Sequence, residues 1–227
     1  MRLLLLAALI LTAACGRPLT PRETAVAAAL SGGTIDPGPV RFHEGHPFAS
    51  YSYTRPIRPR LTCQERLFPP SRGETVELSP GAIALFQRVL WREDLYREDF
   101  FAEMPEVIDL YSAMLFAHEM THVWQWQQRK VTGYHPFRAA AEHQRSEDPY
   151  LFDPDSTGVF ADYGYEQQGS LVEEYVCCQV LDPEAPRTAR LKATIEGAMD
   201  LSGLEALLQA RNVRIPWSGA EVENICR

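Results

Sequence analysis

Residues 105–133 read P-E-V-I-D-L-Y-S-A-M-L-F-A-H-E-M-T-H-V-W-Q-W-Q-Q-R-K-V-T-G, and this stretch does most to decide which fold to expect. No proline or glycine interrupts it between Pro105 and Gly133, and this pattern is typical of one long helix. Apolar side chains recur at helical spacing, and the same stripe continues into His118 and His122. The sequence therefore predicts a helix that turns two imidazoles towards the protein interior.

Residues 118–122 form an H-E-x-x-H pattern. Positions i and i+4 lie on one face of a helix, so His118 and His122 can bind one metal ion. Glu119 lies on the flank, where it can hold a metal-bound water and take its proton. Zn²⁺ suits this chemistry because it lowers the pKa of a bound water to near neutrality. The alternative is a pair of hydrogen-bonded core histidines that bind no metal.

A catalytic zinc takes three protein ligands, so a third residue is needed. Gln125 and Gln128 stand where the longer pattern H-E-x-x-H-x-x-G-x-x-H requires glycine and histidine, so that extension fails. A second helix is expected over about residues 163–176, and Glu166 near its start is the favoured third ligand. His135 and His143, in the intervening chain, can reach the site or lie at the surface.

Glu173 is a candidate to orient a metal-binding histidine without binding the metal itself. It lies seven residues after Glu166, so the two carboxylates share one helix face, and one can bind the metal while the other supports a ligand. The assignment of the two roles stays open, with Glu173 as an alternative ligand. A second alternative makes Glu173 and Glu174 solvated surface residues.

Shorter elements are expected on either side of the motif. Thr20-Pro21-Arg22-Glu23 predicts a helix start, with threonine as the cap and glutamate three residues later. The other expected elements are short strands at 40–43, 49–54 and 74–78, an irregular loop at 55–73, a helix from Ser79-Pro80 to Trp91, a connecting segment at 92–104, and a β-hairpin around 154–157.

The first fifteen residues, M-R-L-L-L-L-A-A-L-I-L-T-A-A-C, have the layout of a signal peptide. Thr12-Ala13-Ala14-Cys15 resembles a bacterial lipobox, in which the cysteine is lipidated and becomes the first mature residue. The expected organisation is a signal peptide at 1–14, a lipid-anchor linker at 15–18 and a single domain at 19–227. Ordinary cleavage nearby, with Cys15 as a free thiol, is the alternative.

Composition narrows the class of protein. The 227 residues are 45% hydrophobic and 23% charged, which is typical of a globular chain. Lys plus Arg number 22 against 30 for Asp plus Glu, a formal charge of −8, and no basic run is present. This balance argues against a nucleic-acid partner.

Four cysteines remain after Cys15, and an even number in an exported chain predicts two disulfides. A bond between the adjacent Cys177 and Cys178 is sterically awkward. We therefore expect Cys63 and Cys226 each to pair with one of those two. The rival interpretation, a thiolate metal site, is not supported by any C-x-x-C spacing.

Four segments together resemble short zinc metallopeptidases of the minigluzincin type, a group that includes domains found with bacterial contractile-injection and toxin-delivery systems. The sharp match is H-E-M-T-H-V-W-Q at 118–125, and three weaker ones follow the expected order within about residues 19–180. The weaker segments are Val40–His43, Gly73–Leu78 and Tyr165–Gly169. The chain departs from the group in its lipoprotein-like start, its extra cysteines, and Gly169 where alanine is usual.

The resemblance implies an α+β, zincin-like fold in which the long motif helix packs on a second, glutamate-bearing helix beside a small sheet. It also implies zinc bound by His118, His122 and Glu166, with Glu119 as catalytic base. A fainter similarity, Asp162-Tyr163-Gly164 to the aspartate-liganded zincins, makes Asp162 an alternative third ligand.

The leading functional expectation is a zinc metallopeptidase that acts on peptide or protein substrates. It would be lipid-anchored in the bacterial cell envelope, facing the periplasm or the cell surface. A non-catalytic envelope lipoprotein, using the same fold as a binding module, is the alternative from another class. A third expectation is a small exported domain that is held by disulfides and binds no metal.

Overall fold

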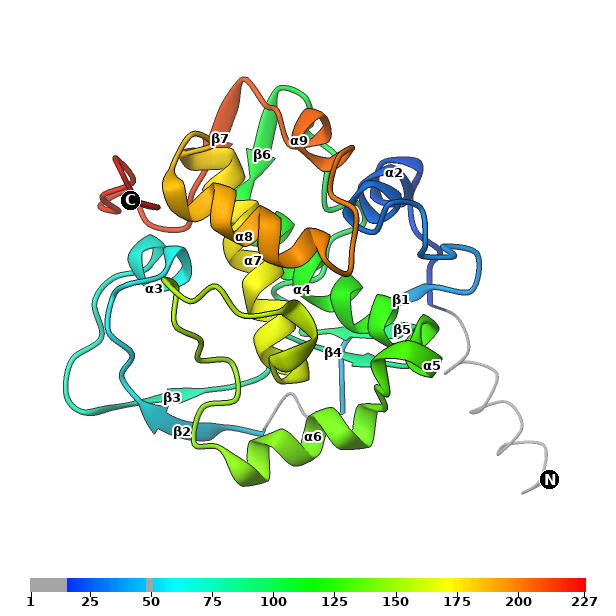
Figure 1. Ribbon diagram of the computed structural model, residues 1–227, viewed down its shortest axis with the longest axis horizontal. Helices are drawn as coiled ribbons and strands as arrows, with labels where there is room; N and C mark the ends of the chain where they lie inside the picture. Colours follow the sequence, from blue (N-terminus) through cyan, green and yellow to red (C-terminus); the bar gives the residue numbers. More distant parts are fainter. Residues whose placement is uncertain (1–15, 48–50) are drawn as a thin grey trace.

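The computed structural model describes residues 16–47 and 51–227, and these form a mixed α+β fold (Figure 1). The expected signal peptide, Cys15 and part of the strand expected at 49–54 lie outside the described residues. The elements, in chain order, are α2 (Pro21–Leu30), β1 (Arg41–Glu44), β2 (Tyr53–Pro56), α3 (Cys63–Leu67), β3 (Thr75–Leu78), β4 (Ala82–Leu85), β5 (Arg88–Trp91), β6 (Val107–Asp109), α4 (Leu110–Gln127), α5 (Arg129–Thr132), α6 (Pro136–Arg145), the short 3-10 helix Phe160–Asp162, α7 (Tyr165–Leu181), α8 (Pro186–Glu196), α9 (Leu204–Leu207) and β7 (Asn212–Arg214).

The motif helix α4 lies at the centre of the fold and is shorter than the sequence predicts. Residues 107–109 form β6 instead, which pairs in parallel with β7. Asp109 then caps the helix, because its side chain accepts a hydrogen bond from the Ser112 amide at 3.0 Å. The helix ends at Gln127, and one further turn, α5, stops at Gly133 with a positive φ of 66°.

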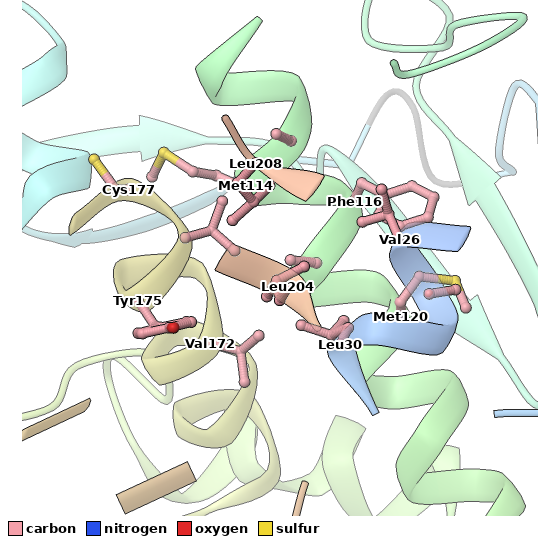
Figure 2. Packing of buried hydrophobic residues seen from close by; sticks show 14 of the residues in the cluster. Val26, Leu30, Met114, Phe116, Met120, Val172, Tyr175, Cys177, Leu204 and Leu208 are labelled. Carbon is pink, nitrogen blue, oxygen red and sulfur yellow. The ribbon is translucent and has the colours of Figure 1, made fainter. Parts of the chain in front are cut away.

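Helix α7 confirms the second helix and packs along α4 (Figure 1). Figure 2 shows side chains of α2, α4, α7 and α9 meeting in one apolar core. Residues that share this core and are fully or almost fully buried include Leu30, Met114, Phe116, Met120, Val172, Tyr175 and Leu204.

Three small sheets surround the helix pair in the described part of the chain. The strand order of the first is β1-β5-β4, with β1 parallel and β4 antiparallel to β5, and α4 packs against β4. Strands β2 and β3 pair antiparallel in a second sheet, and β6 and β7 form the third. The strands expected at 40–43 and 74–78 are confirmed as β1 and β3.

Two disulfides tie the second half of α7 to α3 and to the C-terminal segment. Cys63 in α3 bonds Cys177, and Cys178 bonds Cys226 near the C-terminus. This confirms that each distant cysteine takes one member of the adjacent pair. Cys63, Cys178 and Cys226 also lie close enough together to suggest a metal group, but disulfide-bonded sulfurs offer no thiolate.

Three sequence expectations are wrong. The segment from Ser79-Pro80 to Trp91 is the β4–β5 hairpin rather than a helix, because its apolar residues pair with β1 and cover α4. The hairpin expected around 154–157 has no strands, because Phe152 and Phe160 are buried in the core and do not pair. The loop at 55–73 contains α3, anchored by the Cys63 disulfide.

Within residues 16–47 and 51–227, none of the helices combines the length and the apolar character that a membrane span requires.

Candidate metal centre

His118, His122 and Glu166 form one buried group between α4 and α7. The two Nε2 atoms are 3.2 Å apart, and Glu166 Oε2 lies 3.4 Å from that of His118 and 3.2 Å from that of His122. One ligand atom from each residue lies within 4.8 Å of the others. Two imidazole nitrogens and a carboxylate oxygen are a donor set that suits a divalent metal, so this group can hold a metal ion.

The far nitrogen of each imidazole is held by a second side chain, which leaves both Nε2 atoms aimed at Glu166. His118 Nδ1 lies 3.2 Å from Glu173 Oε2, and His122 Nδ1 lies 2.8 Å from Gln125 Oε1. Such partners fix the tautomer and orientation of metal-binding histidines. Gln125 in turn donates to Gln168 Oε1 at 2.9 Å, which ties α4 to α7 beside the site.

The start of α7, where Glu166 stands, is held by a carboxylate from α6. Glu142 accepts hydrogen bonds from the backbone amides of Tyr165 at 2.9 Å and Glu166 at 3.1 Å. The Glu142 carboxylate takes the place of an N-cap side chain, because Gly164 at the cap position has none.

Gly169 lets α7 approach α4 closely at the site. A Cβ placed on Gly169 would lie 2.8 Å from both Cε1 and Nε2 of His118, closer than such atoms pack. The absence of a side chain at this position therefore leaves the room that the His118 ring occupies.

The charge balance of the group favours a cation. Burial lowers the pKa of His118, but hydrogen bonds with Glu166 and Glu173 outweigh burial and raise it to about 10. Burial likewise lowers the pKa of His122, and the charge and hydrogen bond of Glu166 reverse that effect and raise it. Although burial acts to raise the pKa of Glu166, His122 and His118 hold it well below its usual range. The carboxylates of Glu166 and Glu173 thus stabilise positive charge at the two imidazoles.

Glu119 is buried beside the group but is not part of it. Its side chain is 5% exposed, and its Oε2 atom has no hydrogen-bond partner among the described residues. Burial raises the pKa of Glu119, and the neighbouring His118 and His122 act in the opposite direction. A buried carboxylate oxygen without a partner is costly, and it is the observation that most calls for a function.

The structure separates the other residues that the sequence suggested for the site into those that lie near the metal group and those that do not. Asp162 is exposed and does not belong to the metal group, whereas Glu173 is buried against His118. Glu174 is also buried, which excludes a solvated surface position for it. His143 on α6 does approach the site, with its Nε2 atom 3.8 Å from Glu166 Oε1, while His135 caps α6 instead.

Two tyrosines that no spacing rule points to flank the histidines. Tyr134 is buried and stacks on His122 at 5.8 Å, and the Tyr150 ring lies 5.8 Å from that of His118. The Tyr150 hydroxyl lies 3.5 Å from His143 Nε2. Burial raises the pKa of both tyrosines, so each keeps its hydroxyl proton. Only tertiary packing brings these loop residues to the helix pair.

Neither a protein-family model nor a curated protein matches this chain. Among solved structures, it is similar to the effector domain of Pseudomonas aeruginosa VgrG2b, with a TM-score of 0.49 and 23% sequence identity. The match covers 81% of this chain and 84% of that one.

Proposed function

We propose that the protein is a zinc-dependent metallopeptidase with Glu119 as its catalytic base. The single observation that carries this proposal is the buried, unpartnered Glu119 Oε2 next to a His118–His122–Glu166 group that can hold a metal ion. A site that served only to bind metal would gain nothing from a buried carboxylate left without a partner.

His118, His122 and Glu166 would hold the zinc, and two nitrogens with one oxygen form the open three-ligand set of hydrolytic zinc enzymes. Bound zinc would supply a water of lowered pKa and would polarise a substrate carbonyl. Glu119 Oε2 would accept a proton from the attacking water and would then donate it to the leaving amine. Glu173 and Gln125 would keep the histidine Nε2 atoms aimed at the metal.

Metal stoichiometry with alanine variants tests the ligand set. We expect about one zinc per parent chain and little zinc in His118→Ala, His122→Ala and Glu166→Ala, with Asp162→Ala as the matched control that keeps it. Full zinc in Glu166→Ala would overturn the third ligand. A zinc-loaded parent that cleaves nothing in a broad peptide library would favour the non-catalytic lipoprotein.

We further propose that the protein is anchored in the bacterial cell envelope by lipid on Cys15. The two disulfides support an oxidising compartment outside the cytoplasm. Cys15→Ser is expected to release soluble protein or to stall processing, which membrane fractionation measures. Unchanged fractionation, with no lipid mass on the N-terminal peptide of the parent, would contradict the anchor.

A further inference from the structure

An aromatic cluster lies beyond the end of α4, away from the metal-ligand atoms. The Phe86 ring in the β4–β5 turn lies 4.7 Å from that of Trp126, and His135 lies 5.8 Å from Trp126 and 5.2 Å from Phe137. These residues come from a hairpin turn, the last turn of α4 and the start of α6, so the fold alone assembles the cluster.

Apolar side chains of the cluster, and Val131 on the neighbouring α5, project into solvent. The exposed fractions are 89% for Val131, 74% for Phe137 and 41% for Phe86. Phe86 also holds a left-handed backbone conformation with a φ of 61°, which is costly for a bulky side chain. No described residue of this chain covers these apolar side chains, and gathered together they mark an interaction surface.

Basic residues border the aromatic cluster in an otherwise acidic chain. Arg129 and Lys130 are exposed on α5, and the Arg129 guanidinium lies 4.3 Å above the Trp126 ring. Residues 120–141 contain no Asp or Glu, although the whole chain carries a formal charge of −8. This local excess of positive charge complements an anionic surface.

The patch also lies near the point where the described chain begins. Gly16 packs against His43 on β1, and the Arg41 amide at the start of β1 donates to Gln87 O in the β4–β5 turn, next to Phe86. Figure 1 shows α5 on the same side of the molecule as β1. This step rests on the lipid anchor proposed above for Cys15, because a chain tethered just before Gly16 would carry the patch towards that membrane.

We propose that the patch formed by Phe86, Trp126, Arg129, Lys130, Val131 and Phe137 docks onto an anionic phospholipid bilayer. Tryptophan and phenylalanine partition into the interfacial layer, and basic side chains beside them bind acidic headgroups. The inference needs no metal chemistry. Docking would hold the end of α4, and the Tyr134 ring that stacks on His122, close to the membrane surface.

Quenching of tryptophan fluorescence by brominated lipids tests the proposal on the full chain. Quenching in vesicles of phosphatidylcholine and phosphatidylglycerol, minus that of Trp126→Phe, gives the Trp126 signal. We expect strong quenching for the parent and a loss of about half or more in Val131→Ser/Phe137→Ser. Arg129→Gln/Lys130→Gln is expected to weaken docking about 30-fold and to remove the preference for anionic vesicles.

Leu61→Ser/Val159→Ser is the matched control, because both side chains are exposed and lie outside the patch. It should leave quenching unchanged, and it keeps whatever N-terminal anchor the parent has. The absence of Trp126 quenching on anionic vesicles, or equal quenching in Val131→Ser/Phe137→Ser, would overturn the proposal. A Val131→Ser/Phe137→Ser variant that keeps the quenching of the parent but hydrolyses peptides more slowly would also overturn it, and would assign the patch to a peptide partner.

Discussion

Glu173 and Glu174 are neighbours in α7 and are both buried, yet their carboxylates contact different partners. Glu174 uses both oxygens, since Oε2 accepts from the Cys63 amide at 2.7 Å and Oε1 from Arg187 at 3.0 Å. Glu173 uses Oε2 with His118 at 3.2 Å, and its Oε1 has no hydrogen-bond partner among the described residues.

The difference separates contacts that tie α7 to the rest of the fold from contacts that face the candidate metal group. On the Glu174 side, an ion pair and two disulfides bind α7 to α3, α8 and the C-terminus. On the Glu173 side, polar atoms at Glu173 and Glu119 are left without partners. Arg187 Nε on the Glu174 side also lacks a partner, so the difference lies in the carboxylates. Both oxygens of Glu174 are paired, whereas Glu173 and Glu119 each keep one oxygen without a partner among the described residues, and these oxygens lie on the side of the histidines, where we expect a function.

Breaking the contacts that tie α7 to the rest of the fold should give the largest loss of stability. Glu174→Ala leaves the Arg187 guanidinium buried without its carboxylate, which is expected to cost about 3–5 kcal/mol of unfolding free energy. Zinc content of the folded fraction should stay at the parent level. Chemical denaturation and metal analysis measure the two quantities, and lost zinc with unchanged stability would contradict the separation.

Glu173→Gln should have the converse effect. The amide cannot hold the His118 Nδ1 proton as a carboxylate does, so zinc affinity is expected to fall about 10–100-fold, with little change in the free energy of unfolding. Competition with a chelator measures the affinity, and Glu174→Gln is the neighbouring control. Equal zinc affinity in Glu173→Gln and the parent would remove Glu173 from the support of the site.

Gly169→Ala tests the close approach of the two helices at the site. The added methyl group would lie 2.8 Å from the His118 ring, and overpacking of this kind is expected to cost about 1–3 kcal/mol, shared between stability and metal binding. Gly219→Ala is the control for overpacking away from the site, because its added methyl group would lie 2.6 Å from the Trp217 ring, and it should leave zinc affinity at the parent level. Zinc affinity unchanged by Gly169→Ala would show that the ring has room to move.

The sequence predicts the helical part of the site because its rules are local. The i, i+4 spacing of His118 and His122 places both rings on one face, and the seven-residue spacing places Glu166 and Glu173 on another. Gln125 carries a weaker local signal, since it stands three residues after His122 and so shares its face.

Residues that reach the site from loops carry no such signal. Tyr134 and Tyr150 lie beside the histidines only because α5, α6 and the following loop fold back over α4 and α7. The β4–β5 hairpin fails for a related reason. Its Ser79-Pro80 start resembles a helix cap, but pairing of Arg41 with Arg88, distant in sequence, makes this segment extended.

The most direct test of the central claim is peptide hydrolysis and zinc content measured together in Glu119→Gln, with Glu106→Gln as an exposed control. The glutamine keeps the size of the side chain but cannot accept the proton of the attacking water. The account predicts that hydrolysis falls by about 10²–10⁴-fold while zinc content stays at the parent level. Equally fast cleavage by a zinc-loaded Glu119→Gln variant would contradict it.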